Sequence, residues 1–237
     1  MTTPPYFHIP SIDSLQTEFT LDADTARHVI QVLRMKIGDE LQLTDGKGSL
    51  LTAIIIDDHK KNCRVKKKET LYKNNDTKKI TIAISLLKNG SRFEWFLEKA
   101  AEIGVAAIIP LICERTEKQH FRFERMKSIL ISAMLQSQQT WLPVLHEPLA
   151  LKKIVEQSLQ DQKFIAHCVP ENKKNLLDIV NGSISSQIIL IGPEGDFTHE
   201  EIAFAQQYQF TAVALGKTRL RSETAAMVAA TILKICS

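Results

Sequence analysis

The sequence lacks the residue patterns that mark several common protein classes. Its four cysteines stand far apart with no CxxC pair, and its seven histidines form no HExxH motif or Cys/His cluster. A disulfide framework or a structural metal site is therefore not expected, and we predict that the protein uses no metal. No apolar run is long enough to span a membrane, and the first residues lack the basic and apolar regions of a signal peptide. These absences predict a reduced, cytoplasmic protein with no membrane partner.

Familiar nucleotide-binding and nucleophile loops are also missing. The chain has no GxxxxGKS or GxxxxGKT loop, no GxGxxG after a strand and no GxSxG elbow. A P-loop NTPase, a Rossmann-type cofactor site and an α/β-hydrolase are therefore disfavoured. The excess of positive charge is small, at +3, and 44% hydrophobic with 24% charged residues is ordinary for a folded protein.

Basic residues are nonetheless concentrated in one stretch, residues 59–79. It holds nine lysines and arginines against only Glu69 and Asp76; the nine are Lys60, Lys61, Arg64, Lys66, Lys67, Lys68, Lys73, Lys78 and Lys79. Such a density can neutralise several phosphates of a nucleic acid. A solvated face followed by a charged linker accounts for it equally well.

The two parts of the chain have different hydrophobic patterns. Strand-like runs at residues 40–44 and 50–56, and one helix near residues 26–33 with Asp22 or Asp24 as its cap, predict a small β-barrel. After a polar stretch at residues 71–79, apolar runs alternate with amphipathic helices. That alternation predicts an α/β layer with a mostly parallel sheet, beginning at the buried run 80–87.

Residues 188–198 run from an apolar strand through a glycine-bracketed turn into a helix. The turn is Gly-Pro-Glu-Gly at 192–195, and Thr198 with Glu201 fits a capping box at the start of the helix. Ligands of open α/β sheets bind at such carboxyl ends of strands, where glycine lets the backbone approach them. A tight structural turn explains the same residues.

A second glycine turn follows the apolar residues 212–215. It leads into another predicted helix, with Ser222 as the N-cap. Arg221 stands just ahead of the positive end of that helix, where a cation is disfavoured, so it is a candidate functional residue. Pairing of Arg221 with Glu194 or Glu223 is the structural alternative.

Two further segments have both a structural and a functional reading. Lys99 and Glu102 share one face of the helix that follows residues 88–90, and we expect a surface ion pair between them. Residues 135–143 end a helix in amides and Trp141. These side chains are suited to reading an unstacked base, or they simply finish the helix before a proline.

Together these segments resemble the bacterial 16S rRNA (uracil-N3)-methyltransferases, members of the SPOUT superfamily with an N-terminal PUA-like domain. The resemblance spans nearly the whole chain. It rests on residues 27–39, 88–110, 190–195 and 215–225, which have the order and spacing of the family's signatures. The last two stretches are the most specific.

The resemblance implies an α/β protein with two domains. Residues 73–237 would form a SPOUT-type trefoil-knotted α/β methyltransferase domain, and residues 1–72 a small PUA-like β-barrel that binds RNA. The expected protein is a homodimer that transfers a methyl group from S-adenosylmethionine (SAM) to N3 of a uridine in 16S rRNA of the small ribosomal subunit, releasing S-adenosylhomocysteine.

The resemblance also implies which residues form the site. Two glycine turns, with a third loop after residues 164–168, would hold the cofactor through Leu190, Ile191, Gly192, Pro193, Gly195, Leu215, Gly216, Leu220 and Ser222. RNA would be bound by His28, Arg34, Lys66, Lys67, Arg92 and Gln136. Because the reaction needs a positioned, deprotonated uracil, we assign Arg221 to orienting the base or stabilising its anion. Glu194 would hold Arg221 or assist proton removal.

Three departures from the family pattern are present. Asp196 stands where the family usually has a second glycine, so the turn must accept a Cβ there. Gln139 stands where an arginine that would contact RNA is usual. Thr218 and Arg219 replace a usual Arg-Ile pair.

Three other functions stay open at this point. A non-catalytic RNA-binding module is opposed by the intact glycine turns. A related methyltransferase acting on transfer RNA or another base is opposed by the agreement of the N-terminal signature. An enzyme for a phosphorylated metabolite, bound at the helix after Gly195, would leave the basic N-terminal part unexplained.

Overall fold

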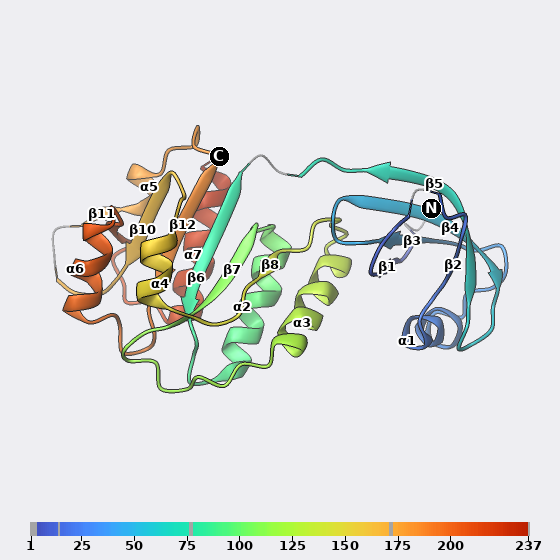
Figure 1. The fold of residues 1–237 in the computed structure, drawn as a ribbon, viewed down its shortest axis with the longest axis horizontal. Coiled ribbons are helices and arrows are strands. Elements are labelled where there is room, and N and C mark those ends of the chain that lie inside the picture. Colours follow the sequence, from blue (N-terminus) through green and yellow to red (C-terminus); the bar gives the residue numbers. More distant parts are fainter. Residues whose placement is uncertain (1–3, 14, 76–77, 171–172, 237) are drawn as a thin grey trace. The chain divides into compact units, whose positions relative to one another are not determined.

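The computed structural model describes residues 4–13, 15–75, 78–170 and 173–236, so residues 1–3 and Asp76, considered above, lie outside the described residues. The chain forms two compact units (Figure 1). One comprises Met1–Asn75 with Met134–Leu142, and the other comprises Asp76–Ala133 with Pro143–Ser237.

The N-terminal unit is built on a five-stranded sheet in the order β1-β3-β4-β5-β2. β1 and β3 are parallel and the other pairs are antiparallel. Bulges in the β4–β5 ladder bend both strands, so the sheet curls around one apolar core. The strands are β1 (Tyr6–His8), β2 (Glu18–Thr20), β3 (Glu40–Thr44), β4 (Ser49–Asp57) and β5 (Arg64–Tyr72).

The helix predicted in this unit is present and is capped by Asp22. α1 (Ala23–Arg27) continues as a π-helical turn, η1 (His28–Val32). The Asp22 carboxylate accepts hydrogen bonds from the backbone N–H groups of Asp24 and Thr25, each at 3.0 Å, which satisfies two donors at the helix start.

Residues 134–142 return to the N-terminal unit although they are distant in sequence from its strands. The Trp141 indole N–H donates to the carbonyl of Lys73 at 2.8 Å, and Lys47 forms a β-bridge with Trp141. Gly48 has a φ of +100°, and a Cβ there would lie 2.6 Å from the Trp141 ring. The ring of Trp141 is therefore used for packing, as in the structural reading of this segment.

The C-terminal unit contains a parallel sheet, as predicted. Its strand order is β11-β13-β10-β12-β6-β7-β8, with β9 paired to β7, and every described pair is parallel. The strands are β6 (Lys79–Ser85), β7 (Ala107–Ile112), β8 (Val144–Leu145), β9 (Leu149–Ala150), β10 (Gln162–Ala166), β11 (Lys174–Asn175), β12 (Ser186–Ile191) and β13 (Thr211–Ala214).

Helices cover both faces of this sheet, which explains its unbroken apolar strands. α2 and α7 pack together and α7 lies on β6 and β12, whereas α4 and α6 pack together with the core that includes Ile188 and Leu190 of β12. None of the described helices is long and apolar enough to cross a membrane. The helices are α2 (Gly90–Ile103), α3 (Phe123–Gln136), α4 (Leu151–Gln157), α5 (Leu176–Ile179), α6 (His199–Gln207) and α7 (Ser222–Ile235).

The predicted capping box of α6 is confirmed. The Thr198 hydroxyl accepts from the backbone N–H of Glu201 at 3.2 Å, and the Glu201 carboxylate accepts from the backbone N–H of Thr198 at 3.0 Å. The same carboxylate accepts from the backbone N–H of Glu114 at 2.9 Å, so it also holds the loop after β7.

Loss of this cap should measurably lower the stability of the protein. We expect Thr198→Ala to lower the free energy of unfolding by about 1 kcal/mol, because it leaves a helix-terminal N–H without its acceptor. Thr198→Ser, which keeps the hydroxyl, should lose much less. Urea unfolding of both variants checks this, and equal losses in the two would contradict a role for the hydroxyl.

Candidate functional site

A cavity of about 660 Å³ lies at the carboxyl ends of β10, β12 and β13. These three strands are neighbours in a parallel sheet, so the loops that follow them leave from the same edge. The cavity is lined by residues 166–168 with Lys173, by residues 191–194 with Asp196, and by residues 213–222 with Ala225. Both glycine turns found in the sequence thus face one space.

Most of the predicted cofactor residues line this cavity, and two do not. Seven of the nine do so, and Arg221 and Glu194 also line it; the seven are Ile191, Gly192, Pro193, Leu215, Gly216, Leu220 and Ser222. Leu190 is fully buried in the core beside α4 and α6. Gly195 faces the side chain of Arg115 instead.

The first turn is tightly packed at its beginning. The backbone N–H of Asp196 donates to the carbonyl of Pro193 at 2.9 Å, which closes the turn. Gly192 is buried, and a Cβ added to it would lie 3.1 Å from the ring of Phe197 and 3.3 Å from its backbone nitrogen. A side chain at 192 would therefore press on Phe197, which is itself almost fully buried.

Three hydrogen bonds tie this turn to loops that follow other strands. Glu194 Oε1 accepts from the backbone N–H of Lys88, after β6, at 3.1 Å. Arg115 Nη1, after β7, donates to the carbonyl of Gly195 at 2.8 Å. Asp196 Oδ2 accepts from the backbone N–H of Cys168, after β10, at 2.7 Å. The wall of the cavity is thus fixed from three sides.

The second turn presents two arginines. Gly216 has a φ of +128°, which favours glycine, and the exposed Arg219 and Arg221 follow. Among the described residues neither guanidinium has a hydrogen-bond or ion-pair partner, so the structural alternative, pairing of Arg221 with Glu194 or Glu223, is absent. A cation without a protein partner on a cavity wall is available to a ligand.

The start of α7 differs from the prediction. Arg221, not Ser222, occupies the N-cap position, and its side chain makes no capping bond; Ser222 is the first helical residue. The Ser222 cap was therefore predicted one residue too late. Glu223 is buried in the first turn, with Oε1 3.6 Å from Arg92 Nε of α2. Arg92 is thereby placed beside the start of α7.

The other predicted RNA-binding residues lie in the N-terminal unit. His28 and Arg34 belong to η1 and the segment after it, both are exposed, and Arg34 has a φ of +56°, which is uncommon for arginine. Lys66 and Lys67 lie in β5, which was not predicted as a strand. Gln136 is exposed at the end of α3.

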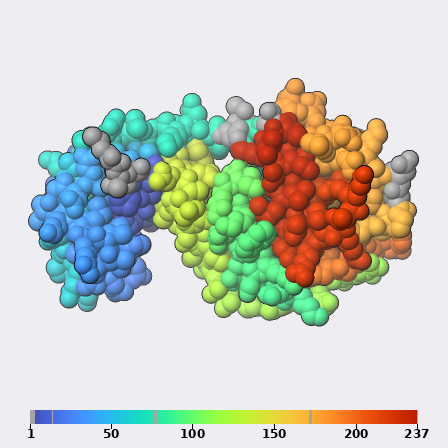
Figure 2. Space-filling model, turned by 180° about the vertical axis from the view of Figure 1, so that it is seen from behind, coloured from blue at the N-terminus to red at the C-terminus, as the bar shows by residue number. Residues whose placement is uncertain are grey.

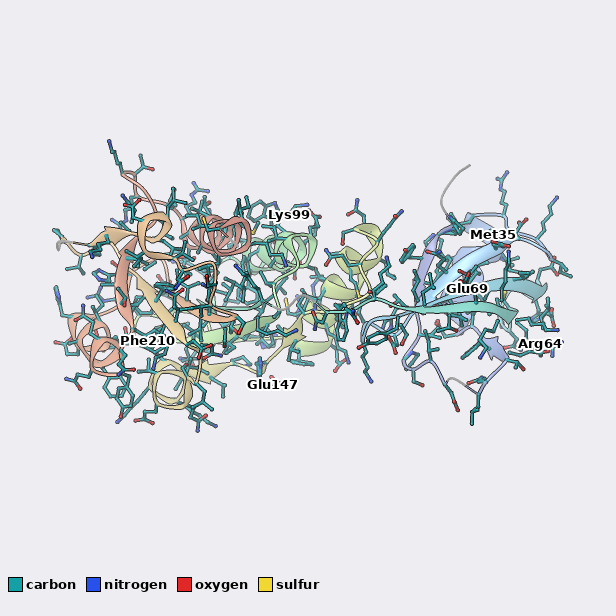
Figure 3. The ribbon with its side chains drawn as sticks, turned by 90° about the horizontal axis from the view of Figure 1, so that it is seen from above. Met35, Arg64, Glu69, Lys99, Glu147 and Phe210 are labelled. Carbon is teal, nitrogen blue, oxygen red and sulfur yellow. The ribbon has the colours of Figure 1, made fainter. Side chains whose placement is uncertain are left out.

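Part of the basic stretch is neutralised within the same unit. Arg64, labelled in Figure 3, forms ion pairs with Glu18 and Asp57 at 3.6 Å each, and Lys68 pairs with Glu40. The field toward a polyanion is therefore weaker than the count of charges indicates. On α2, Lys99, also labelled in Figure 3, pairs with Glu102 at 2.8 Å, as the structural reading of that helix predicted, and in addition with Glu98.

Sequence reasoning from residues alone missed the wall formed after β10. His167 and Cys168 line the cavity, and Lys173 donates to the carbonyls of His167 and Val169 at 2.6 and 2.7 Å. The signal was available, because residues 164–168 end a buried strand in polar side chains at the edge where ligands bind. No group of three or more metal-ligating side chains occurs among the residues described.

The cysteines should differ sharply in reactivity. Burial raises the pKa of Cys63 to about 11 and that of Cys113 to about 12, with Asp57 and Glu201 respectively adding to the shift. Cys168 is exposed on the cavity wall. We expect iodoacetamide to modify Cys168 in the native protein while Cys63 and Cys113 react only after unfolding. Peptide mass spectrometry checks this, and labelling of Cys113 at the rate of Cys168 would contradict the described burial.

Comparison with known protein families agrees with this arrangement. The RNA methyltransferase domain family matches residues 73–234, and the RNA methyltransferase PUA domain family matches residues 21–68. The ribosomal RNA small subunit methyltransferase E of Synechocystis sp. is 32% identical over 221 residues, which are 91% of this chain and 72% of that protein. The chain belongs to the ribosomal RNA small subunit methyltransferase E family. The Rickettsia conorii member is 29% identical, over 90% of this chain and 88% of its own.

Solved structures of similar proteins share the whole fold. The small subunit methyltransferase E of Neisseria gonorrhoeae, bound to S-adenosylmethionine, superposes with a TM-score of 0.88 at 28% identity over 98% of both chains. A Legionella pneumophila protein in complex with the cofactor SAM gives 0.89 at 30% identity, over 99% of this chain and 98% of that one. The predicted fold class, a SPOUT-type knotted α/β domain with a small PUA-like N-terminal domain, is confirmed.

Proposed function

We propose that this protein transfers a methyl group from S-adenosylmethionine to N3 of a uridine in 16S rRNA of the small ribosomal subunit. The observation that carries the proposal is the single cavity onto which both glycine turns and Arg221 open. The family membership and the bound SAM in two of its relatives support the cofactor. The relatives' names support ribosomal RNA of the small subunit as the substrate.

The cavity suits a ligand of this kind. Its volume of about 660 Å³ lies within the usual range of 300–1,000 Å³ for small-ligand sites. Its walls combine the apolar side chains of Ile191, Leu215 and Leu220 with the side-chain-free positions Gly192 and Gly216. Such a lining can enclose a nucleoside while backbone groups bind its polar edges. We therefore assign the cofactor to the predicted residues that line the cavity.

The residues around the cavity indicate how the reaction would be assisted. When bound, SAM supplies an electrophilic methyl group. Uracil N3 attacks this carbon only after losing its proton, which places negative charge on the base and its carbonyl oxygens. The unpaired guanidinium of Arg221 is suited to orient the uracil and stabilise that charge. Glu194 lines the same wall, and its Oε1 is bonded to Lys88; proton removal by its carboxylate stays part of the proposal.

RNA binding is proposed for the PUA-like domain, residues 1–72, acting with the methyltransferase domain, residues 73–237. His28, Arg34, Lys66 and Lys67 would contact the RNA backbone from the first, and Gln136 and Arg92 from the remainder of the chain. The family match over residues 21–68 to an RNA methyltransferase PUA domain supports this role. The place of action would be the cytoplasm, where ribosomal subunits are found.

We also propose that two copies associate through α7. This helix is apolar almost all round, and Met227, Val228 and Ile232 remain only half-buried while Ile235 is 73% exposed. Figure 2 shows α7, in red, on the surface beside α2, in green. A helix without a polar face is expected to be covered.

Sedimentation equilibrium tests this association. The wild type should give twice the chain mass, and Ile235→Glu should shift the equilibrium toward the monomer. A monomeric wild type would refute the association.

The reaction is tested by identifying the methylated nucleoside. Small ribosomal subunits that lack the modification are incubated with the protein and SAM, and the RNA is digested and analysed by mass spectrometry. The proposal predicts 3-methyluridine, formed only when both protein and SAM are present. Methylation of a different base, or methylation of transfer RNA in preference to the small subunit, would support the related activity instead.

A further inference from the structure

Asp196 occupies a position that glycine would fill at lower cost. Its φ is +65°, in the left-handed region that a side chain other than asparagine or aspartate adopts reluctantly. The residue is half-buried on the wall of the cavity. A glycine has no Cβ to oppose this conformation, so the aspartate is held here at a cost in backbone conformation. A compensating contact is therefore expected.

That contact joins the first glycine turn to the loop after β10. Asp196 Oδ2 accepts from the backbone N–H of Cys168 at 2.7 Å, while Oδ1 accepts from the N–H of Phe197 at 2.9 Å. One carboxylate thus bridges two loops that both line the same cavity. A glycine at 196 could not make either bond.

A second side chain also holds this loop. Lys173 Nζ donates to the carbonyls of His167 and Val169 and lies 3.2 Å from His167 Nδ1. The N–H of Cys168 and the carbonyls on either side of it are therefore bonded to side chains of opposite charge. This loop makes no hydrogen bonds of the sheet, so its backbone groups would otherwise form hydrogen bonds with water. The ammonium and the carboxylate together fix this loop in one conformation.

We propose that Asp196 is a positioning residue for the cofactor, acting with Lys173 to hold the 167–169 loop as the third wall of the cavity. The inference rests on the proposed function, since it assigns SAM to this cavity. Asp196 acts through the backbone of Cys168, so its effect should appear in cofactor affinity and not in the methyl-transfer step itself. The Asp196 carboxylate would thus tighten the site.

Three variants at position 196 separate the bond from the strain. Asp196→Asn keeps an acceptor oxygen and tolerates the left-handed conformation, so SAM affinity should stay within about twofold of wild type. Asp196→Gly removes the bond and the strain together, and affinity should fall about tenfold while the unliganded protein unfolds at the same temperature or higher. Asp196→Ala removes only the bond, so it should lose both affinity and stability. Lys173→Met is expected to lose affinity without adding fully to Asp196→Gly.

Gln209 provides a matched control. It has a φ of +68°, nearly the same as that of Asp196, and it is exposed at the end of α6, away from the residues that line the cavity. Gln209→Gly should raise stability slightly and leave SAM affinity unchanged. A loss of affinity in Gln209→Gly equal to that in Asp196→Gly would show that glycine at a left-handed position, not the missing bond, is the cause.

A readout without cofactor distinguishes this inference from the proposed function. Hydrogen exchange of the Cys168 amide should be about tenfold faster in Asp196→Gly and unchanged in Asp196→Asn, because only the glycine variant frees that N–H. Unchanged exchange, or unchanged SAM affinity, in Asp196→Gly would overturn the positioning role. If the wild type bound no SAM, the proposed function would fail, and faster exchange would still establish the tie between the loops.

Discussion

Gly192→Val is expected to weaken SAM binding on the order of a hundredfold. A Cβ at 192 would already lie 3.1 to 3.3 Å from the ring and backbone nitrogen of Phe197, which is tighter than nine in ten real Cβ contacts. Phe197 is 1% exposed and packs in the α4–α6 core, so it cannot move aside without disturbing that core. The turn must shift instead, and the overpacking is worth about 1–3 kcal/mol. Equilibrium dialysis with labelled SAM measures the affinity.

An intermediate variant and a control variant accompany Gly192→Val. Gly192→Ala adds one carbon and should give an intermediate loss. Gly90, the first residue of α2, has nothing within 4 Å of an added Cβ, so Gly90→Ala should bind SAM as the wild type does. Circular dichroism establishes that each variant is folded. A folded Gly192→Val protein with wild-type affinity would mean that the cofactor does not rest against this turn.

Arg221→Ala is expected to lower the turnover number by about a hundredfold to a thousandfold while SAM affinity changes little. Loss of one preorganised donor at developing negative charge has a cost of this size in other enzymes. The guanidinium has no partner among the described residues, so its removal leaves no buried charge behind and should not unfold the protein. Single-turnover methyl transfer at saturating SAM measures the effect.

Two further variants decide whether the geometry of Arg221 matters. Arg221→Lys keeps the charge but not the planar fork of donors, so it should recover only part of the rate. Arg122, which is exposed just before α3, is the matched arginine outside the cavity, and Arg122→Ala should keep the wild-type rate. Full activity in Arg221→Ala would remove this residue from the mechanism. An equal fall in Arg122→Ala would point to a general effect of surface charge.

The parallel sheet could be predicted because its strands are buried on both faces. Such strands read as apolar runs, and β6 and β12 were found at the runs predicted from residues 80 and 188 onward. The caps at Asp22 and Thr198 were readable because a short polar side chain before a helix has one dominant use. β5 was missed because five of the nine residues in Arg64–Tyr72 are charged. With most of the strand exposed, its sequence does not show the alternation of apolar and polar residues that predicts a strand. The return of residues 134–142 to the N-terminal unit is a tertiary contact with no local signature.

The candidate site was predictable to a similar, limited degree. Glycines at the ends of two strands identified the turns, since backbone that approaches a ligand or another ring tolerates no side chain. Hydrogen bonds between different loops could not be predicted. The bond from Cys168 to Asp196, for example, joins residues 28 positions apart. The same holds for Glu194, which accepts a bond from Lys88 and makes no ion pair with Arg221, one of the two roles predicted for it. Sequence patterns report local preference, whereas these bonds depend on which strands become neighbours.

Calorimetric titration of the wild-type protein with S-adenosylmethionine, and then with S-adenosylhomocysteine, tests the central claim most directly. The cavity described above predicts saturable binding of both compounds at one site per chain, and no comparable binding of ATP, for which no P-loop is present. Absence of binding by the folded protein, or equal binding of ATP, would contradict the assignment of this cavity to SAM.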